Sequence, residues 1–263
     1  MIQEFYYGTS WTWPIEHMPR IMLSASFLDA RKSAIDLNNK PYMVDSGVGM
    51  IFSNRTKRAE KRIGIERYAE LIIRQNPPIA WTLDYPCEPS IRKEFGYSAT
   101  EAQIRTNENT IYLRDELSLK NVMSVVQGWE ISDYARNLEL IKEQGLETPY
   151  LGIGSICRRG YLNEIVKIIK MISSNSSGNT RMHAFGIKKQ VLQTEARYYI
   201  NSADSHAWAV IAFGRYENNG RGIKGRTIKD KLPYLLDFVN EIEDLVKMPD
   251  PLSQFSERGG DGN

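Results

Sequence analysis

The sequence predicts a single (β/α)8 barrel of the TIM type with an irregular outline, and three observations lead to this expectation. The chain has 263 residues, and an α/β barrel needs roughly 250. Short β-like runs alternate with amphipathic helical stretches, as in a parallel sheet with crossover helices. Residues suited to ligand binding recur at the ends of those runs. We expect the barrel over residues 1–248 and a disordered tail, rich in Pro, Gly, Ser and charge, over 249–263.

The strands are predicted from short apolar runs that turn residues interrupt. The clearest runs cover residues 42–45, 79–84, 122–127 and 150–154, with 181–186 and 198–202 following them and 207–213 as a further candidate. Helical periodicity is found over residues 57–75, 98–117, 132–144, 163–172 and 230–246. Ser98 is expected to cap the second of these helices with Glu101 reaching back to it, and Gly145 to end the third.

Composition excludes several classes of protein. Hydrophobic residues make up 41% and charged residues 25%, which is typical of a globular chain. No apolar run approaches the roughly 18 residues of a membrane span, so we expect a cytoplasmic protein (in the host cytoplasm if a virus encodes it) with no membrane partner. Cys87 and Cys157 stand far apart without a metal-binding spacing, and the 152–155 segment lacks a phosphate-loop pattern. No metal and no cofactor are therefore predicted.

The candidate site residues share a position at or just beyond a predicted strand. In an α/β barrel the carboxyl ends of all strands face one mouth, where catalysis is built. Residues from distant segments are therefore expected to converge on one small ligand. The six are Asp45, Asp84, Gln127, Gly154, Phe185 and Asp204.

Two of these carboxylates have the chemistry of a glycosyl-transfer site. Asp204 lies among small residues, and a carboxylate can attack the anomeric carbon of a nucleoside while an acid protonates the departing base. Asp45 precedes a Gly-containing turn that would let a ligand approach. Taken one at a time, simpler interpretations stay open: Asp45 as a turn residue, Asp84 as a local N–H cap and Gln127 as a solvated surface residue.

Basic residues provide candidate phosphate contacts. Arg158 and Arg159 form a pair after the fourth clear strand, and a solvated basic pair is the alternative. A basic stretch further along could clamp phosphates or be a solvated loop; its candidates are Arg215, Arg221, Lys224 and Arg226. His183 stands isolated, and adjacent Ser205 and His206 would point to opposite faces of a strand. Neither supports a metal site or a Ser/His pair.

At these residues the sequence resembles the tRNA-guanine transglycosylase superfamily, in order, over residues 42–213. Asp45-Ser46-Gly47 looks like the segment whose aspartate is the general acid/base. The segment around Asp204 is similar to the one that bears the nucleophilic aspartate. By the same resemblance, the incoming base would be held by Asp84, Gln127, Gly128 and Gly154, with Phe185 stacked on its face.

Departures from the superfamily pattern indicate one branch of it. Val48 replaces the second glycine after Asp45. The Cys-x-Cys-x-x-Cys and His of the zinc-binding insertion do not follow Asp204, and neither does an RNA-binding domain. The chain therefore looks most like the DNA 7-deazaguanine transglycosylases of the DpdA type, which replace guanine in DNA and so protect it from restriction nucleases.

The resemblance implies a base exchange in DNA through a covalent aspartyl-glycosyl intermediate, with free 7-cyano-7-deazaguanine or a relative as the second substrate. A homodimer or companion proteins would be possible partners. Three alternatives stay open at this point: a zinc-free tRNA transglycosylase, a catalytically silent nucleic-acid-binding barrel, and a hydrolase of small nucleosides.

Overall fold

The computed structural model describes residues 1–47, 63–212 and 227–249, and these form a closed barrel of parallel strands. Each strand pairs with the next along the chain, and β8 closes the ring by pairing with β1, with Tyr6 opposite Asp204. The strands are β1 (Glu4–Thr9), β2 (Ile21–Ser24), β3 (Tyr42–Asp45), β4 (Ile79–Trp81), β5 (Val122–Val126), β6 (Tyr150–Ile153), β7 (Arg181–Ala184) and β8 (Ser202–Ser205). The predicted (β/α)8 fold class is confirmed.

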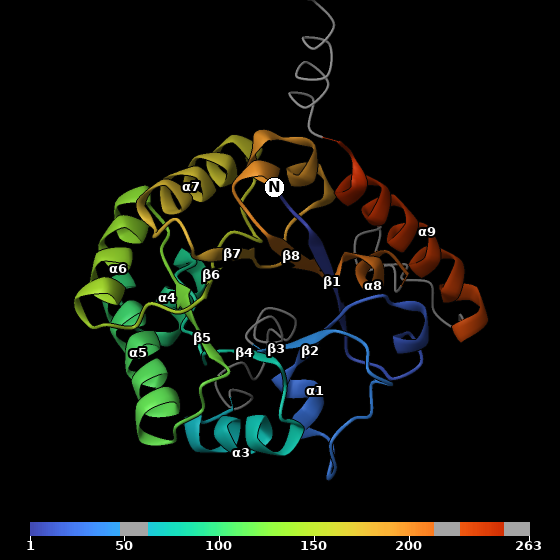
Figure 1. Cartoon of the computed structure of the whole chain (residues 1–263), viewed down its shortest axis with the longest axis horizontal. Helices are drawn as coiled ribbons and strands as arrows, with labels where there is room; N and C mark the ends of the chain where they lie inside the picture. The colour runs from blue at the N-terminus through green and yellow to red at the C-terminus, as the bar shows by residue number, and fades with distance from the viewer. Residues whose placement is uncertain (48–62, 213–226, 250–263) are drawn as a thin grey trace, which may run out of the picture.

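The helices lie on the outside of the ring of strands (Figure 1). They are α1 (Ala25–Asp29), α3 (Ile65–Gln75), α4 (Pro89–Phe95), α5 (Ala99–Ile111), α6 (Ile131–Glu143), α7 (Leu162–Asn175), α8 (Ala207–Ala212) and α9 (Ile228–Lys247). Within the described ranges, no helix has the length and apolar character that a membrane crossing would need.

Side chains along strands β1 to β6 alternate between two apolar clusters, as the pleat requires. Phe5 and Tyr7 of β1 face outward and pack edge-on against Phe238 of α9, whereas Tyr6 between them faces the barrel interior. The barrel is thus a packed core rather than a pore. The buried residues of the interior cluster are Tyr6, Met22, Met43, Trp81, Met123, Val125 and Tyr150.

The predicted helix boundaries agree with the structure to within a few residues wherever they can be compared. Ser98 and Glu101 form a capping box at the start of α5: the Ser98 hydroxyl accepts from the Glu101 amide at 3.1 Å, and the Glu101 carboxylate accepts from the Ser98 amide at 2.7 Å. Gly145 follows α6 with φ of 65°, a left-handed conformation that suits glycine. The helix predicted over 57–75 begins at Ile65 within the described residues.

Two strand predictions are wrong. A strand is predicted over residues 198–202, but β8 starts only at Ser202. The preceding Glu195–Tyr198 segment is a 3-10 helix, at whose start the Thr194 hydroxyl accepts a hydrogen bond from the Ala196 amide. Residues 207–213 were a candidate strand, but Ala207–Ala212 is helix α8. A short apolar run has no periodicity that separates a buried strand from a buried helix. The Ser205 hydroxyl accepts from the Ala207 amide at 3.2 Å and so favours the helical start.

Candidate active site

Three carboxylates meet at the carboxyl-terminal mouth of the barrel. Asp45 ends β3, Asp204 lies in β8, and Asp84 follows β4. The charges of Asp204 and Asp84 both raise the pKa of Asp45, so the three groups are close enough to interact electrostatically. Tyr68 of α3 lies beside them. The pKa of its phenol is raised well above 10, chiefly by burial and then by the charges of Asp45 and Asp84.

The environment of Asp45 keeps this carboxyl near the midpoint of its titration at neutral pH. Burial is the largest cause and the charge of Asp204 the next, and they outweigh the hydrogen bond from the Gly47 amide at 2.6 Å, so the pKa rises from 3.8 to about 7. Gly47 has φ of 78°, and a Cβ there would lie 2.6 Å from the Ser26 hydroxyl oxygen. A carboxyl with this pKa can both give and take a proton at neutral pH.

Asp204 is buried, with 7% of its surface exposed, and one of its oxygens is fixed. Oδ1 accepts from the Gly186 amide at 2.9 Å and lies 3.3 Å from His183 Nε2. Among the described residues no hydrogen bond to Oδ2 is found. The fixed Oδ1 orients the carboxylate so that Oδ2 is the oxygen suited to nucleophilic attack.

His183 is a site residue that the sequence analysis missed. Its ring is completely buried, its Nδ1 lies 2.7 Å from the Ser202 hydroxyl, and it stacks on Trp81 with ring centroids 4.9 Å apart. These contacts hold Nε2 toward Asp204. The available signal was spacing: Ser202 and Asp204 occupy alternate positions on one side of β8, and His183 of β7 has the same two-residue spacing from Phe185, which lies just beyond that strand.

Asp84 and Gln127 form a hydrogen-bonded pair at the mouth. The Gln127 side-chain amide donates to Asp84 Oδ2, and the Ser46 hydroxyl donates to Asp84 Oδ1. The Gln127 side chain is 1% exposed, and its own backbone is fixed by Asn137, whose side chain accepts the Gln127 amide at 2.7 Å. Gln127 is thus a buried, oriented group rather than a solvated surface residue.

The predicted glycines leave room for other site residues. A Cβ on Gly154 would lie 2.2 Å from the side-chain amide nitrogen Nε2 of Gln127. A Cβ on Gly128 would lie 2.7 Å from the backbone nitrogen of Tyr134 in the first turns of α6. The Gly154 amide donates to the Val126 carbonyl at 3.0 Å within the sheet. What the structure supports for Gly154 is therefore the space it leaves for Gln127, and a direct bond from its amide to a base stays a prediction.

Phe185 lies just beyond β7, half-buried at the mouth. Its ring is edge-on to Trp81 at 5.1 Å between centroids. A Cβ on Gly152 would lie 2.5 Å from the Phe185 ring, so the glycine at that position makes room for the ring. An aromatic face in this place can stack on a flat heterocycle.

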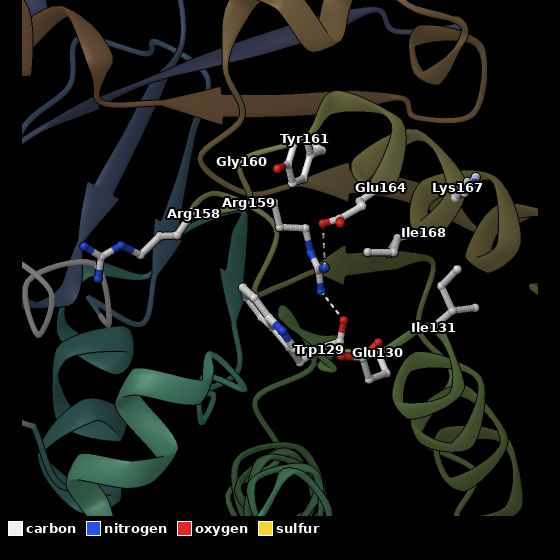
Figure 2. Close-up of a pocket in the computed structure, with 10 residues that line it drawn as sticks. All are labelled: Trp129, Glu130, Ile131, Arg158, Arg159, Gly160, Tyr161, Glu164, Lys167 and Ile168. Atoms are coloured by element: carbon white, nitrogen blue, oxygen red, sulfur yellow. Dashed lines mark hydrogen bonds and ion pairs between the residues drawn. The ribbon is translucent and has the colours of Figure 1, made fainter.

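The basic residues predicted to contact phosphate differ in their surroundings. Arg159 is 5% exposed, donates to the Trp129 carbonyl, lies 4.3 Å from the centre of the Trp129 ring and pairs with Glu164 at 3.5 Å. Both arginines line a pocket of about 410 Å³, and Figure 2 shows the Arg158 side chain extending away from the other labelled side chains. Arg158 is exposed. Arg215, Arg221, Lys224 and Arg226 lie outside the described residues.

Comparison with known proteins identifies a family for almost the whole chain. The family DpdA, described as DeoxyPurine in DNA protein A, matches residues 1–248. No curated protein matches the chain.

Proposed function

This chain belongs to the DpdA family, the DNA-directed branch of the transglycosylase superfamily, and from this premise we propose that it exchanges guanine in DNA for a 7-deazaguanine such as 7-cyano-7-deazaguanine. The proposed route is a covalent intermediate in which Asp204 is esterified to the sugar. The observation that carries the proposal is the placement of Asp45 at the end of β3 and Asp204 in β8 at one mouth of the barrel, where the charge of Asp204 raises the pKa of Asp45. Two interacting carboxyls with different surroundings can divide acid/base and nucleophilic work.

In the first displacement, Asp204 Oδ2 attacks C1′ of a deoxyguanosine in the strand. The C1′–N9 bond breaks, its electron pair goes to guanine N9, and the proton that neutralises the base comes from Asp45 or from a water that Asp45 orients. In the second, the incoming 7-deazaguanine loses its N9 proton to Asp45 and attacks C1′. The ester bond then breaks and Asp204 leaves as a carboxylate.

The purine edge would be held by the Asp84–Gln127 pair. A carboxylate accepts from the N1–H and exocyclic amine of guanine, and the second N–H of the Gln127 amide donates to its carbonyl. Phe185 would stack on the face of the base. The target nucleotide must leave the duplex first, at a cost of a few kcal/mol, and Arg158 is an exposed cation at the mouth that can attract the phosphate backbone.

A single assay tests the proposal. The protein is incubated with radiolabelled guanine or 7-cyano-7-deazaguanine, and DNA and tRNA are offered separately. We expect label to enter DNA, and we expect Asp204→Ala to fold and to incorporate none. Label in tRNA alone would contradict the DNA assignment, and full activity of Asp204→Ala would contradict the assignment of the nucleophile. Cleavage of free guanosine without incorporation into a polymer would indicate a nucleoside hydrolase instead.

A further inference from the structure

A chain of hydrogen bonds connects a buried glutamate to the predicted base-binding pair. Ser155 Oγ lies 2.8 Å from Glu88 Oε2 and 2.7 Å from Gln127 Oε1. The same oxygen accepts from the Cys87 amide at 2.8 Å. At the other end of the Gln127 side chain, Nε2 donates to Asp84. Four side chains from the loops after β4, β5 and β6 are thus joined in one line, with a carboxyl at each end.

The hydrogens in this line can be counted. A hydroxyl has one proton, so Ser155 can donate to Glu88 or to Gln127 but not to both. If Ser155 donates to Gln127 Oε1, then Glu88 must carry a proton and donate it to Ser155. If the Gln127 amide is rotated, its NH2 donates to Ser155 and Ser155 donates to Glu88. Gln127 Oε1 then faces Asp84, which must carry the proton instead. With both carboxyls ionised, one of these short contacts would lack a hydrogen.

The surroundings favour Glu88 as the neutral member. Glu88 is 3% exposed, whereas Asp84 lies half-buried at the mouth and also accepts from the Ser46 hydroxyl. Burial is the largest influence on Glu88 and raises its pKa, and the charge of Asp84 adds to this. The bond to Ser155, its own backbone amide and the charge of Arg158 act in the opposite direction. Among the described residues, the titratable groups that interact with Glu88 include Asp84, Cys87, Tyr134, Cys157 and Arg158.

We propose that Glu88 is a positioning residue that holds one proton and, through Ser155, fixes the orientation of the Gln127 amide toward the base. With the proton on Glu88, Asp84 stays a carboxylate that accepts from the N–H groups of guanine, and the amide NH2 is directed at the guanine carbonyl. In the opposite arrangement Asp84 is neutral and the amide orientation is reversed, which no longer matches the donors and acceptor of guanine. The inference rests on the proposed function for the identity of the ligand, but the position of the proton does not depend on that function.

Two substitutions separate donation from packing. Glu88→Met removes the donor at similar size, and we expect KM for free 7-cyano-7-deazaguanine to rise about tenfold or more, with a smaller effect on kcat. Glu88→Gln keeps a neutral donor to Ser155, and we expect it to recover most of that loss. The wild-type KM should rise as pH increases through the pKa of Glu88, and this rise should be absent from Glu88→Gln. If Glu88→Gln is as defective as Glu88→Met, the proposal is wrong.

An infrared difference spectrum at neutral pH locates the proton without any assay of exchange. Asp45→Asn is introduced into both proteins, so that the half-titrated Asp45 carboxyl does not contribute. Subtracting the spectrum of Glu88→Gln from its parent should leave the carbonyl stretch of a protonated carboxylic acid. If only a carboxylate band is lost, the proposal is overturned even where the wild type exchanges bases. If the protonated band is present but the wild type incorporates no base into DNA, the proposed function fails while the proton assignment stands. The infrared result also decides the matter if Glu88→Met does not fold.

Discussion

Replacing Asp45 by Asn is expected to stabilise the protein at neutral pH while it removes the acid/base group. The folded state raises the pKa of Asp45 from 3.8 to about 7, chiefly by burial and then through the charge of Asp204. Between these pH values the folded chain holds a proton that the unfolded chain has released. Stability therefore falls as pH rises through this window and levels off above pH 7. An asparagine cannot ionise, so the variant does not lose this stability.

The magnitude follows from the two pKa values. Each unit of difference between the folded and unfolded states corresponds to about 1.4 kcal/mol, so the rise from 3.8 to about 7 corresponds to about 4 kcal/mol. The free energy of unfolding of Asp45→Asn, minus that of the wild type, should thus increase by about 4 kcal/mol from about pH 4 to about pH 8. Urea unfolding of both proteins across this range measures the difference.

Asp237→Asn is a matched control, since Asp237 is exposed on α9. Its stability should stay parallel to that of the wild type at every pH. If the curves of Asp45→Asn and the wild type are also parallel, Asp45 is not held neutral by burial and by Asp204, and the close approach of the two carboxyls is refuted.

Two other substitutions test the geometry of the mouth. Gly154→Ala would place a methyl group 2.2 Å from the side-chain amide nitrogen of Gln127, and displacement of that amide should lower the rate of base exchange by about 100-fold. The control is Gly160→Ala, which has open space around its Cβ position and should leave the rate unchanged. Equal rates for the two variants would contradict this account. His183→Phe retains an aromatic ring but loses the hydrogen bond to Asp204. Single-turnover kinetics should therefore show a chemical step slower by about 10-fold to 100-fold, and a rate equal to that of the wild type would mean that His183 does not orient the nucleophile.

The sequence alone predicts those strands in which an apolar run ends at clear turn residues. The predicted runs at 42–45 and 122–127 agree with β3 and β5 because turn residues end each of them. β1 and β2 were not predicted, although their apolar side chains alternate between the two clusters. The run at 207–213 is a candidate strand from its apolar residues alone, because such a short run has no periodicity that separates a buried strand from a buried helix, and in the structure it forms helix α8.

For the candidate site, the ends of the predicted strands indicate which residues face the mouth of the barrel, but they do not indicate which side chains hydrogen-bond to one another. Asp45 and Asp204 are predicted site residues because barrel topology brings distant strand ends to one mouth, and in the structure the charge of Asp204 raises the pKa of Asp45. His183 and Glu88 were missed because their significance lies in contacts with Asp204 and Ser155, which are distant in sequence. Hydrogen-bond partners of this kind leave no local pattern in a single sequence.

The central claim is that Asp204 becomes covalently attached to the DNA sugar, and capture of that adduct is its most direct test. The protein is mixed with DNA in the absence of free base, denatured, digested and analysed by mass spectrometry. We predict a deoxyribose-linked peptide that contains Asp204, that is missing from Asp204→Asn and that disappears when 7-cyano-7-deazaguanine is added before denaturation. An adduct on Asp45, or incorporation of the new base by an enzyme in which no adduct can be trapped at Asp204, would contradict the account.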